Sequence, residues 1–405
     1  MKKTIAFIFG LLLIAVSSFA AENDTSVKES PASDFEYDLN ETEDGVVITG
    51  YRGKGGDIVI PAEIEGYPVV ECNGTFNSGY VSITSIIFPD SITKISEFSA
   101  SSWALKKVIF PKHLKEIPAY MFNKYSNITT LQLPEDVEII GEYAFAGLAI
   151  SEISLPNTVQ KIAEYAFANC EKLKTVTLPS SLKEIGDSVF SGCNNIESLN
   201  LSDGIESIDS GVFSHTAIRA LTIPSSVKKI GREAFYYCKN LETLMLPDGI
   251  EEIESYAFAD TAIKKLVIPL SVKRIGEGAF KKCEQLESLT LSDGIESIEA
   301  EAFYSTAIKI LTIPASVKRI EGSAFAWNNK LETLVISEGI EFIGSRAFSG
   351  SPNLISVTLP EKQIEYQNKE YNDYADCFSN CPQIPLKDRK KIRNTGYTGG
   401  FNEDR

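Results

Sequence analysis

Residues 238–282 read CKNLETLMLPDGIEEIESYAFADTAIKKLVIPLSVKRIGEGAFKK, and residues 283–327 read CEQLESLTLSDGIESIEAEAFYSTAIKILTIPASVKRIEGSAFAW. These two stretches of 45 residues are nearly the same, and a third, similar stretch begins at Cys193. Each stretch divides into two similar halves, so the repeating unit has 22 or 23 residues. A period of that length is typical of solenoids, in which one supersecondary unit is stacked many times.

Within one unit, the apolar residues predict two short strands and a turn. Leu241, Leu244 and Leu246 have the spacing of a strand that points its apolar side chains into a core. Proline then ends the strand, because it has no N–H to donate to a neighbouring strand. Ile250 and Ile253 predict a second short segment, and the Ala-Phe pair that follows predicts a tight helical turn whose Phe fills the core. We therefore expect parallel strands stacked along one axis.

The unit pattern L-x-x-L-x-L-P-x-x-L-x-x-I-x-x-x-A-F resembles the leucine-rich repeats of the BspA-like family, the treponemal class. The resemblance covers about Val70 to Pro382 and implies a leucine-rich repeat solenoid. Proteins similar to this are exported or surface proteins of spirochaetes and of oral and gut anaerobes, and several act as adhesins for host matrix proteins or other bacteria. The resemblance thus implies a protein partner, either a host extracellular matrix protein or another bacterial surface.

The N-terminal residues 1–20, MKKTIAFIFGLLLIAVSSFA, predict a secretory signal peptide. Lys2 and Lys3 precede an apolar run, and Ser18 and Ala20 are the small residues of a cleavage site. An anchor helix that stays in place is the alternative. No other stretch has the 18 or more apolar residues of a membrane span. We expect the mature chain to lack a span and to be exported to the periplasm, the cell surface or the medium.

The rest of the chain divides by composition. Residues 21–34 are polar and predict a flexible leader, and residues 35–69 carry short β patterns between glycines, which predict a small antiparallel β N-terminal cap. Residues 70–382 form the repeat array, and residues 383–405 predict a short C-terminal helix and tail. The tail carries a basic run, for which an anionic docking site and a capping helix with a solvated face are the two interpretations; we favour the second. The run is Lys387, Arg389, Lys390, Lys391 and Arg393.

The formal net charge of −16 argues against nucleic-acid binding, because an acidic chain repels phosphate backbones. The two histidines, His113 and His215, have no catalytic motif around them, and no CxxC pair with histidines suggests a metal site. We expect no enzyme activity, cofactor or metal. Five of the seven cysteines share one repeat position, which predicts buried free thiols rather than cross-links. Whether Cys377 and Cys381 pair is left open.

Charged residues alternate in sign from one repeat to the next. We expect this alternation to place opposite charges side by side on stacked repeats and to fix their register. The column on the first strand is Glu197, Arg219, Glu242, Lys264, Glu287, Lys309 and Glu332. The column on the second segment is Lys183, Glu206, Lys228, Glu251, Lys273, Glu296, Lys318 and Glu341.

The outward positions of the first strand remain as a candidate partner-binding surface. These positions carry methyl and hydroxyl groups and no charge, which suits a protein partner; the alternative is an ordinary strand surface of β-branched residues. The residues are Thr177, Asn200, Thr222, Met245, Val267, Thr290, Thr312, Val335 and Thr358. We expect a monomeric, exported protein that binds proteins or cell surfaces, with a structural scaffold or spacer of the cell envelope as the alternative.

Overall fold

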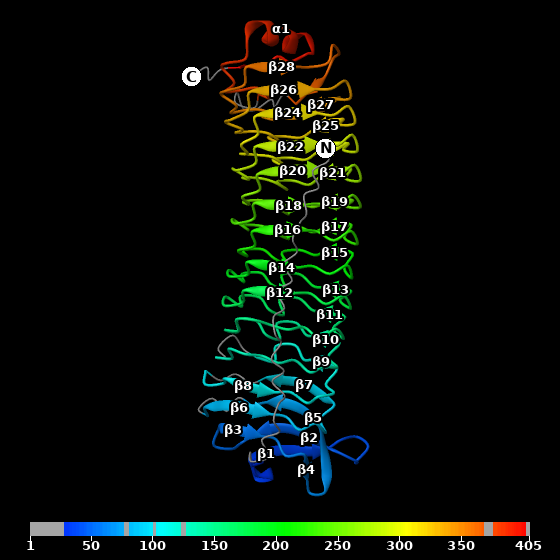
Figure 1. The fold of residues 1–405 in the computed structure, drawn as a ribbon, viewed down its shortest axis with the longest axis vertical. Coiled ribbons are helices and arrows are strands. Elements are labelled where there is room, and N and C mark those ends of the chain that lie inside the picture. Colours follow the sequence, from blue (N-terminus) through cyan, green and yellow to red (C-terminus); the bar gives the residue numbers. More distant parts are fainter. Residues whose placement is uncertain (1–27, 77–80, 100–102, 123–126, 368–375, 402–405) are drawn as a thin grey trace, which may run out of the picture.

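The computed structural model describes residues 28–76, 81–99, 103–122, 127–367 and 376–401. Two columns of short parallel strands run along an elongated molecule, and most repeats contribute one strand to each column (Figure 1). The parallel-strand solenoid expected from the repeats is confirmed. The predicted signal peptide, the first residues of the predicted leader and the end of the tail lie outside the described residues.

The first column holds the strands that precede the proline or serine of each repeat. They are β3 (Gly56–Val59), β6 (Ile83–Ile87), β8 (Lys107–Ile109), β12 (Thr175–Thr177), β14 (Ser198–Asn200), β16 (Ala220–Thr222), β18 (Thr243–Met245), β20 (Lys265–Ile268), β22 (Ser288–Leu291), β24 (Ile310–Ile313), β26 (Thr333–Ile336) and β28 (Ser356–Thr358). Each inward side chain is flanked by outward neighbours, as in Lys265–Ile268, where Leu266 and Ile268 are buried and the other two are exposed.

The second column holds mostly two-residue strands. They are β2 (Val46–Tyr51), β5 (Tyr67–Thr75), β7 (Lys94–Ser99), β9 (Glu116–Ile117), β10 (Ile139–Ile140), β11 (Lys161–Ile162), β13 (Glu184–Ile185), β15 (Ser207–Ile208), β17 (Lys229–Ile230), β19 (Glu252–Ile253), β21 (Arg274–Ile275), β23 (Ser297–Ile298), β25 (Arg319–Ile320), β27 (Phe342–Ile343) and β29 (Glu365–Tyr366). The strands from β15 to β29 form one continuous eight-stranded sheet.

The N-terminal cap combines antiparallel and parallel pairing. Strand β1 (Phe35–Leu39) follows a 3₁₀ turn at Ala32–Asp34 and pairs antiparallel with β2; β4 (Glu63–Ile64) pairs antiparallel with β5. The antiparallel cap is therefore confirmed for these two pairs. Strands β2, β5 and β7 pair in parallel, and so do β3, β6 and β8. The cap thus supplies β3 and β2, the first strands of the two columns. It also supplies β1, which pairs with β2 and so covers the open edge of the second column.

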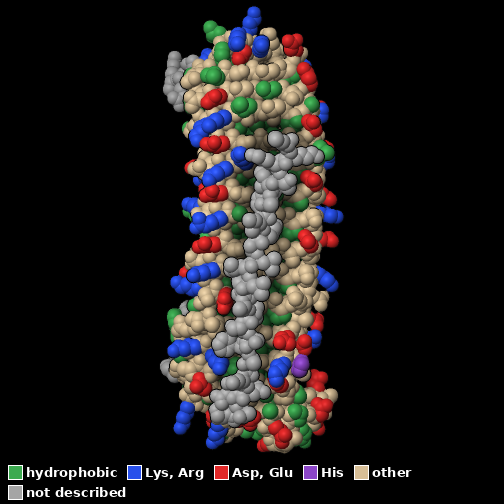
Figure 2. Space-filling model, in the orientation of Figure 1, with side chains coloured by type: hydrophobic (Ala, Val, Ile, Leu, Met, Phe, Trp, Pro, Cys, Tyr) green, Lys and Arg blue, Asp and Glu red, His purple; other side chains and the backbone are tan. Residues whose placement is uncertain are grey.

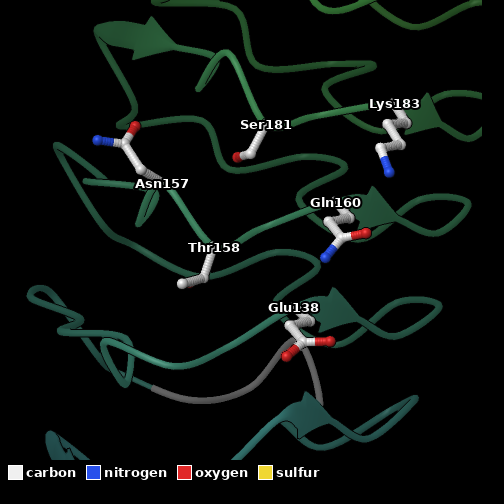
Figure 3. Close-up of a pocket in the computed structure, with 6 residues that line it drawn as sticks. All are labelled: Glu138, Asn157, Thr158, Gln160, Ser181 and Lys183. Carbon is white, nitrogen blue, oxygen red and sulfur yellow. The ribbon is translucent and has the colours of Figure 1, made fainter.

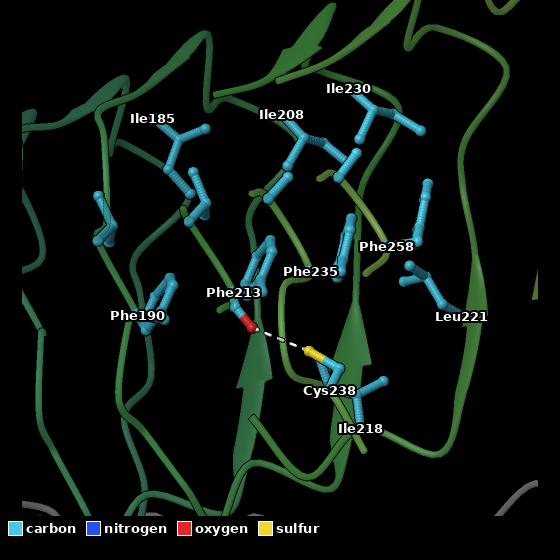
Figure 4. Packing of buried hydrophobic residues seen from close by; sticks show 14 of the residues in the cluster. Ile185, Phe190, Ile208, Phe213, Ile218, Leu221, Ile230, Phe235, Cys238 and Phe258 are labelled. Carbon is cyan, nitrogen blue, oxygen red and sulfur yellow. Dashed lines mark hydrogen bonds between the residues drawn. The ribbon is translucent and has the colours of Figure 1, made fainter. Parts of the chain in front are cut away.

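A stack of phenylalanine rings forms the centre of the solenoid. From Phe145 to Phe378 the ring centroids of successive repeats lie 5.3–5.6 Å apart. Most of these pairs are nearly parallel; Phe235 and Phe258, for example, are inclined by 3°. Figure 4 shows Phe190, Phe213, Phe235 and Phe258 following one another in a row, with the isoleucines of the second strands along one side of it. The Phe predicted to fill the core of each repeat does so.

The predicted helical turn is a series of hydrogen-bonded turns. Each repeat from Phe145 to Phe348 places two residues in the left-handed backbone region, one before the core pair that ends in Phe and one after it, such as Tyr256 (φ 58°) and Asp260 (φ 58°). Left-handed residues interrupt an α-helix, so the segment turns tightly and returns the chain to the next repeat. In the described part of the chain, α1 (Leu386–Asn394) is the single α-helix, and no helix there is long and apolar enough to cross a membrane.

Helix α1 caps the last repeat, as the capping interpretation of the basic run expects. The buried Asp388 carboxylate accepts a hydrogen bond from the Val357 N–H of β28 at 3.4 Å. Arg389 donates to the carbonyls of Ile384 and Pro382, and its guanidinium lies 5.1 Å from the centroid of the Phe401 ring. The three lysines of the run are exposed to solvent.

All seven cysteines are buried and free, Cys377 and Cys381 included. In five repeats the thiol donates to the carbonyl of the preceding repeat's phenylalanine; Cys238 Sγ, for example, lies 3.2 Å from Phe213 O (Figure 4). Burial raises the pKa of Cys238 to about 11 and that of Cys283 to about 12. The thiols of Cys238 and Cys283 are therefore protonated near neutral pH, and the prediction of free, buried cysteines is confirmed.

We expect the native protein to leave its thiols unreacted with a thiol-specific disulfide reagent at pH 8. The thiolate is the reactive species. Burial keeps the reagent away from all seven thiols, and where the pKa is raised it also lowers the fraction of thiolate. After denaturation all seven thiols are expected to react, and the measurement is the absorbance of the released reagent with and without guanidinium. Rapid reaction of the folded chain, or fewer than seven thiols after unfolding, would contradict this prediction.

Candidate functional site

The nine residues predicted as a partner surface lie in one column on the outward side of the first strands. Cross-strand pairing places Thr222 beside Met245, Val267 beside Thr290, and Thr358 beside Val335. Eight of the nine are exposed, and Val335 is half-buried. Strands β12 to β28, which carry them, follow one another along the molecule (Figure 1). The structure therefore brings these residues together as one face, which we call the strand face.

The strand face has a second exposed column, two residues earlier on each strand, that the sequence reasoning missed. It includes Ile310, whose exposed fraction of 64% is as large as those of Met245 (60%) and Val267 (62%) in the predicted column. Leu270, just after β20, is also 64% exposed. The signal was present in the sequence, because positions i and i+2 of a strand point to the same side. The face is thus two residues wide and carries several exposed apolar side chains, together with the charged Lys265 in its second column.

Charged side chains border the strand face, and stacked repeats bring opposite charges together. The Glu242 N–H donates to Arg219 O at 2.9 Å, so these repeats are in register, and Lys264 Nζ lies 2.5 Å from Glu242 Oε2. The Lys264 hydrogen bond lowers the pKa of the Glu242 carboxyl. On the second segment, Lys318 pairs with Glu341 at 3.6 Å. Figure 2 shows basic and acidic side chains following one another along the edges of this face.

Other ion pairs are formed by residues in the second strands or just after them, outside the column that the sequence singled out. Lys161 pairs with Glu184 at 2.7 Å, and Lys229 pairs with Glu254 at 2.6 Å. The hydrogen bond to Glu254 raises the pKa of Lys229. The sequence did not predict these pairs, because the first residue of the second strand is uncharged in several repeats, so charges of opposite sign do not alternate regularly there. All of them are exposed, so each contributes little to stability by itself.

Reversing one charge in the first column, Lys264→Glu, is expected to lower the thermal unfolding midpoint modestly. The change removes the pair with Glu242 and sets a third carboxylate between Glu242 and Glu287. Salt screens exposed charges, so the difference from the native chain should shrink between low and high ionic strength. Thermal unfolding at two salt concentrations measures this. Lys264→Gln, which removes the charge without adding one, is the control; a deficit unchanged by salt would reject the electrostatic explanation.

A shallow hollow of about 380 Å³ lies between the two strand columns, at the turns that join them (Figure 3). Its two hydroxyls already donate to backbone carbonyls, Thr158 to Glu135 O at 2.8 Å and Ser181 to Val159 O at 2.7 Å. In these bonds the proton of each hydroxyl points to a backbone carbonyl and not to a side-chain base that could activate it as a nucleophile. The remaining lining residues are Glu138, Asn157, Gln160 and Lys183.

The titratable groups of the described residues include a surface histidine–carboxylate pair but no metal-binding cluster. His113 contacts the Asp136 carboxylate at 2.8 Å on the surface, which lowers the pKa of Asp136. Within the described ranges, no group of three or more His, Cys, Asp or Glu residues could hold a metal ion.

Comparison with known proteins identifies the repeats. A family model described as a BspA type leucine rich repeat region matches six copies, within residues 73–174, 138–264 and 251–385. No protein of known, curated function matches the chain. A leucine-rich repeat protein from Bacteroides ovatus has 21% identity and a TM-score of 0.54, over 82% of this chain and 94% of that one, and shows the same fold. A leucine rich cell surface protein from Faecalibacterium prausnitzii has 25% identity and a TM-score of 0.47, over 85% and 96%.

Proposed function

The chain belongs to the BspA-type leucine-rich repeat family, and from that premise we propose that it is an exported protein whose strand face binds another protein, as an adhesin does. Leucine-rich repeat proteins mediate protein interactions, and proteins of this family are typically found at the cell surface. The partner that suits the face is a host matrix protein or a protein on another bacterium. Export is proposed from the sequence of residues 1–20 alone.

The observation that carries the proposal is the strand face itself. Along nine repeats it presents a predicted column with no charge, in a chain with 94 charged residues of the four types Lys, Arg, Asp and Glu (39 basic and 55 acidic). Met245 and Val267 stand on adjacent strands with about 60% of each side chain exposed. Interface centres are depleted of charge and enriched in methionine and aromatic residues, with polar rims. The strand face with its charged borders has this arrangement, and a repeat array accumulates contact area over many repeats.

A spacer without a ligand remains the second candidate, because Thr and Val on the strand face are also residues that strands prefer. The two candidates differ in whether binding occurs. The first experiment measures binding of the chain from residue 21 onward to immobilised matrix proteins and to whole bacterial cells. Saturable binding supports the adhesin, and its absence across the panel supports the spacer. N-terminal sequencing of the exported protein tests the cleavage before Ala21.

Three lysines on the strand face are expected to weaken such binding at least tenfold, because each would bury an unpaired charge at the interface. The variant carries Thr222→Lys, Met245→Lys and Val267→Lys on adjacent strands. A matched control adds the same charge on the opposite turns, at the two left-handed positions where Lys282 and Arg346 show that basic residues are accepted. The control carries Ser188→Lys, Ser305→Lys and Ser323→Lys.

A second comparison tests the basic tail. The variant with Lys390→Glu and Lys391→Glu is expected to bind as the native chain does, since both lysines point to solvent from the capping helix. Binding kinetics on a sensor surface report all three variants. Loss in the tail variant alone would move the site from the strand face to α1, and equal loss in the turn control would show a general charge effect.

A further inference from the structure

Three repeats depart from the pattern of the turn that follows the core phenylalanine. The residue directly after that phenylalanine is alanine or serine in most described repeats, so a small side chain satisfies the stacking. The small residues are Ala146, Ala168, Ser191, Ser214, Ala259, Ala326, Ser349 and Ser379. The same position holds Tyr236, Lys281 and Tyr304 in the three exceptions. Because the scaffold does not require these large side chains, their clustering in neighbouring repeats points to a site.

The exceptions create a hollow on the turn side of the solenoid. Ala259 lies in the repeat between those of Tyr236 and Lys281, and its small side chain forms the floor between two large ones. Tyr256, Asp260 and Lys282 complete the walls, and the hollow measures about 440 Å³. Volumes of roughly 300–1,000 Å³ are usual for sites of small ligands. The turn hollow, as we call it, is therefore large enough for one or two sugar rings.

The aromatic walls are held in place by their neighbours. The Tyr256 hydroxyl donates to Glu277 Oε1 at 2.9 Å, and burial, with that hydrogen bond, raises the pKa of Tyr256 to about 12. The His215 ring packs against Tyr236 edge to face, with centroids 5.5 Å apart. Lys281 forms an ion pair with Glu301. A neutral phenol and rings fixed in this way require little reorganisation when a ligand packs against them.

The charges around the turn hollow select the class of ligand. Arg232 Nε is paired with Glu233 Oε1 at 3.0 Å, and Lys281 is paired with Glu301. Asp260 and Lys282 remain on successive repeats without an ion pair to any described residue. An anionic ligand would be repelled by Asp260, a cationic ligand by Lys282, and an apolar ligand would desolvate both. A neutral ligand with hydroxyl groups can donate to the carboxylate and accept from the ammonium group.

We propose that the turn hollow binds a neutral saccharide, whose C–H face packs on Tyr236 and Tyr256 while its hydroxyls bond to Asp260 and Lys282. Tyrosine suits this role because it offers an apolar ring with a polar tip. The site lies on the turns and not on the strand face, so it is independent of the protein-binding function proposed above. It gives the solenoid a second kind of ligand, a glycan, at repeats that also carry the strand face on another side.

The test uses neutral hexoses and their charged analogues with the folded chain. Saturation-transfer NMR with glucose, galactose, mannose and N-acetylglucosamine, and with disaccharides of them, identifies the sugar bound best, at concentrations suited to dissociation constants of order 1 mM. The uronic acid and the amino sugar derived from that best-bound sugar are expected to bind more weakly than the neutral sugar itself. Tyr236→Ala, which installs the residue found at this position in other repeats, is expected to weaken binding about tenfold.

Two further variants make the outcome specific. Asp260→Asn installs asparagine, which occurs at the same left-handed position in other repeats as Asn169 and Asn380. This variant should bind the neutral sugar more weakly, and the difference in affinity between the neutral sugar and its uronic acid should become smaller. Tyr165→Ser, which installs the residue that Ser188 supplies in the next repeat, should leave binding unchanged. Absence of binding by every neutral sugar, preference for a charged analogue, or equal loss in Tyr165→Ser would overturn the proposal. Matrix-protein binding lost in Tyr236→Ala without any sugar binding would make the hollow part of a protein interface instead.

Discussion

Phe258→Ala is expected to lower the free energy of unfolding by about 3–5 kcal/mol, the range observed when a large buried aromatic side chain is removed from a core. The Phe258 ring is fully buried, with its centroid 5.3 Å from that of Phe235 and 5.4 Å from that of Phe280. Its removal leaves a cavity between two rings that the backbone holds at the repeat spacing. The neighbouring strands β17, β19 and β21 are hydrogen-bonded to one another, so the gap cannot close easily.

Denaturant unfolding followed by circular dichroism measures this change, and hydrogen exchange locates it, since destabilisation in a repeat array is expected to concentrate near the altered repeat. Met245→Ala is the control in the same repeat, because Met245 is exposed and its truncation should change stability by less than about 0.5 kcal/mol. A loss below about 1 kcal/mol for Phe258→Ala would show that the stack does not form the core.

The second large effect is expected at Gly339→Ala, which should destabilise the chain by about 1–3 kcal/mol or more. A Cβ at Gly339 would lie 1.6 Å from the Ala315 carbonyl oxygen in the preceding repeat. That oxygen belongs to the backbone and cannot rotate away, so the repeats must separate locally. The turn after the first strand, where the next repeat comes closest, imposes this requirement rather than the backbone conformation of the glycine itself.

Gly249→Ala is the matched control, because it lies at the same repeat position. A Cβ at Gly249 would meet only Ser225 O, at 3.6 Å, an ordinary contact. Replacing glycine by alanine without a clash removes freedom from the unfolded chain, so this variant should be neutral or slightly stabilised, by about 0.4–1 kcal/mol. The two unfolding midpoints are compared directly. Equal stability of the two variants would refute close approach of the repeats as the cause.

These contacts also explain why the sequence repeats most exactly over 45 residues. The charge columns already give the two kinds of unit opposite signs. The structure adds a steric alternation, since Gly294 and Gly339 leave no room for a Cβ while the equivalent positions of the other units hold serines. The structure also shows a polar contact between the two kinds of unit, since Thr261 Oγ1 lies 3.2 Å from Cys283 Sγ of the next repeat. Each kind of unit therefore has its complement in the other, through charge, space and hydrogen bonding.

The sequence by itself determined the features that depend on the period. A column of identical residues at intervals of 22 or 23 must stack if the units stack, so the Phe core, the free thiols, the parallel strands and the strand face were all predictable from position in the unit. The same reasoning identified which residues share a side of a strand. It predicted one outward position of each strand and missed the second, which includes Ile310.

The tertiary structure decided what depends on the shape of the turns. The left-handed residues on either side of each Ala-Phe pair set the directions of the side chains between them, and this geometry cannot be read from polarity or period. It places Ala259 between Tyr236 and Lys281 and thereby makes the turn hollow from three different repeats. It also decides which of several neighbouring charges pair and how closely one repeat's backbone approaches the next. Those properties depend on differences of about an ångström in the distance between chain segments that are a whole repeat apart in the sequence.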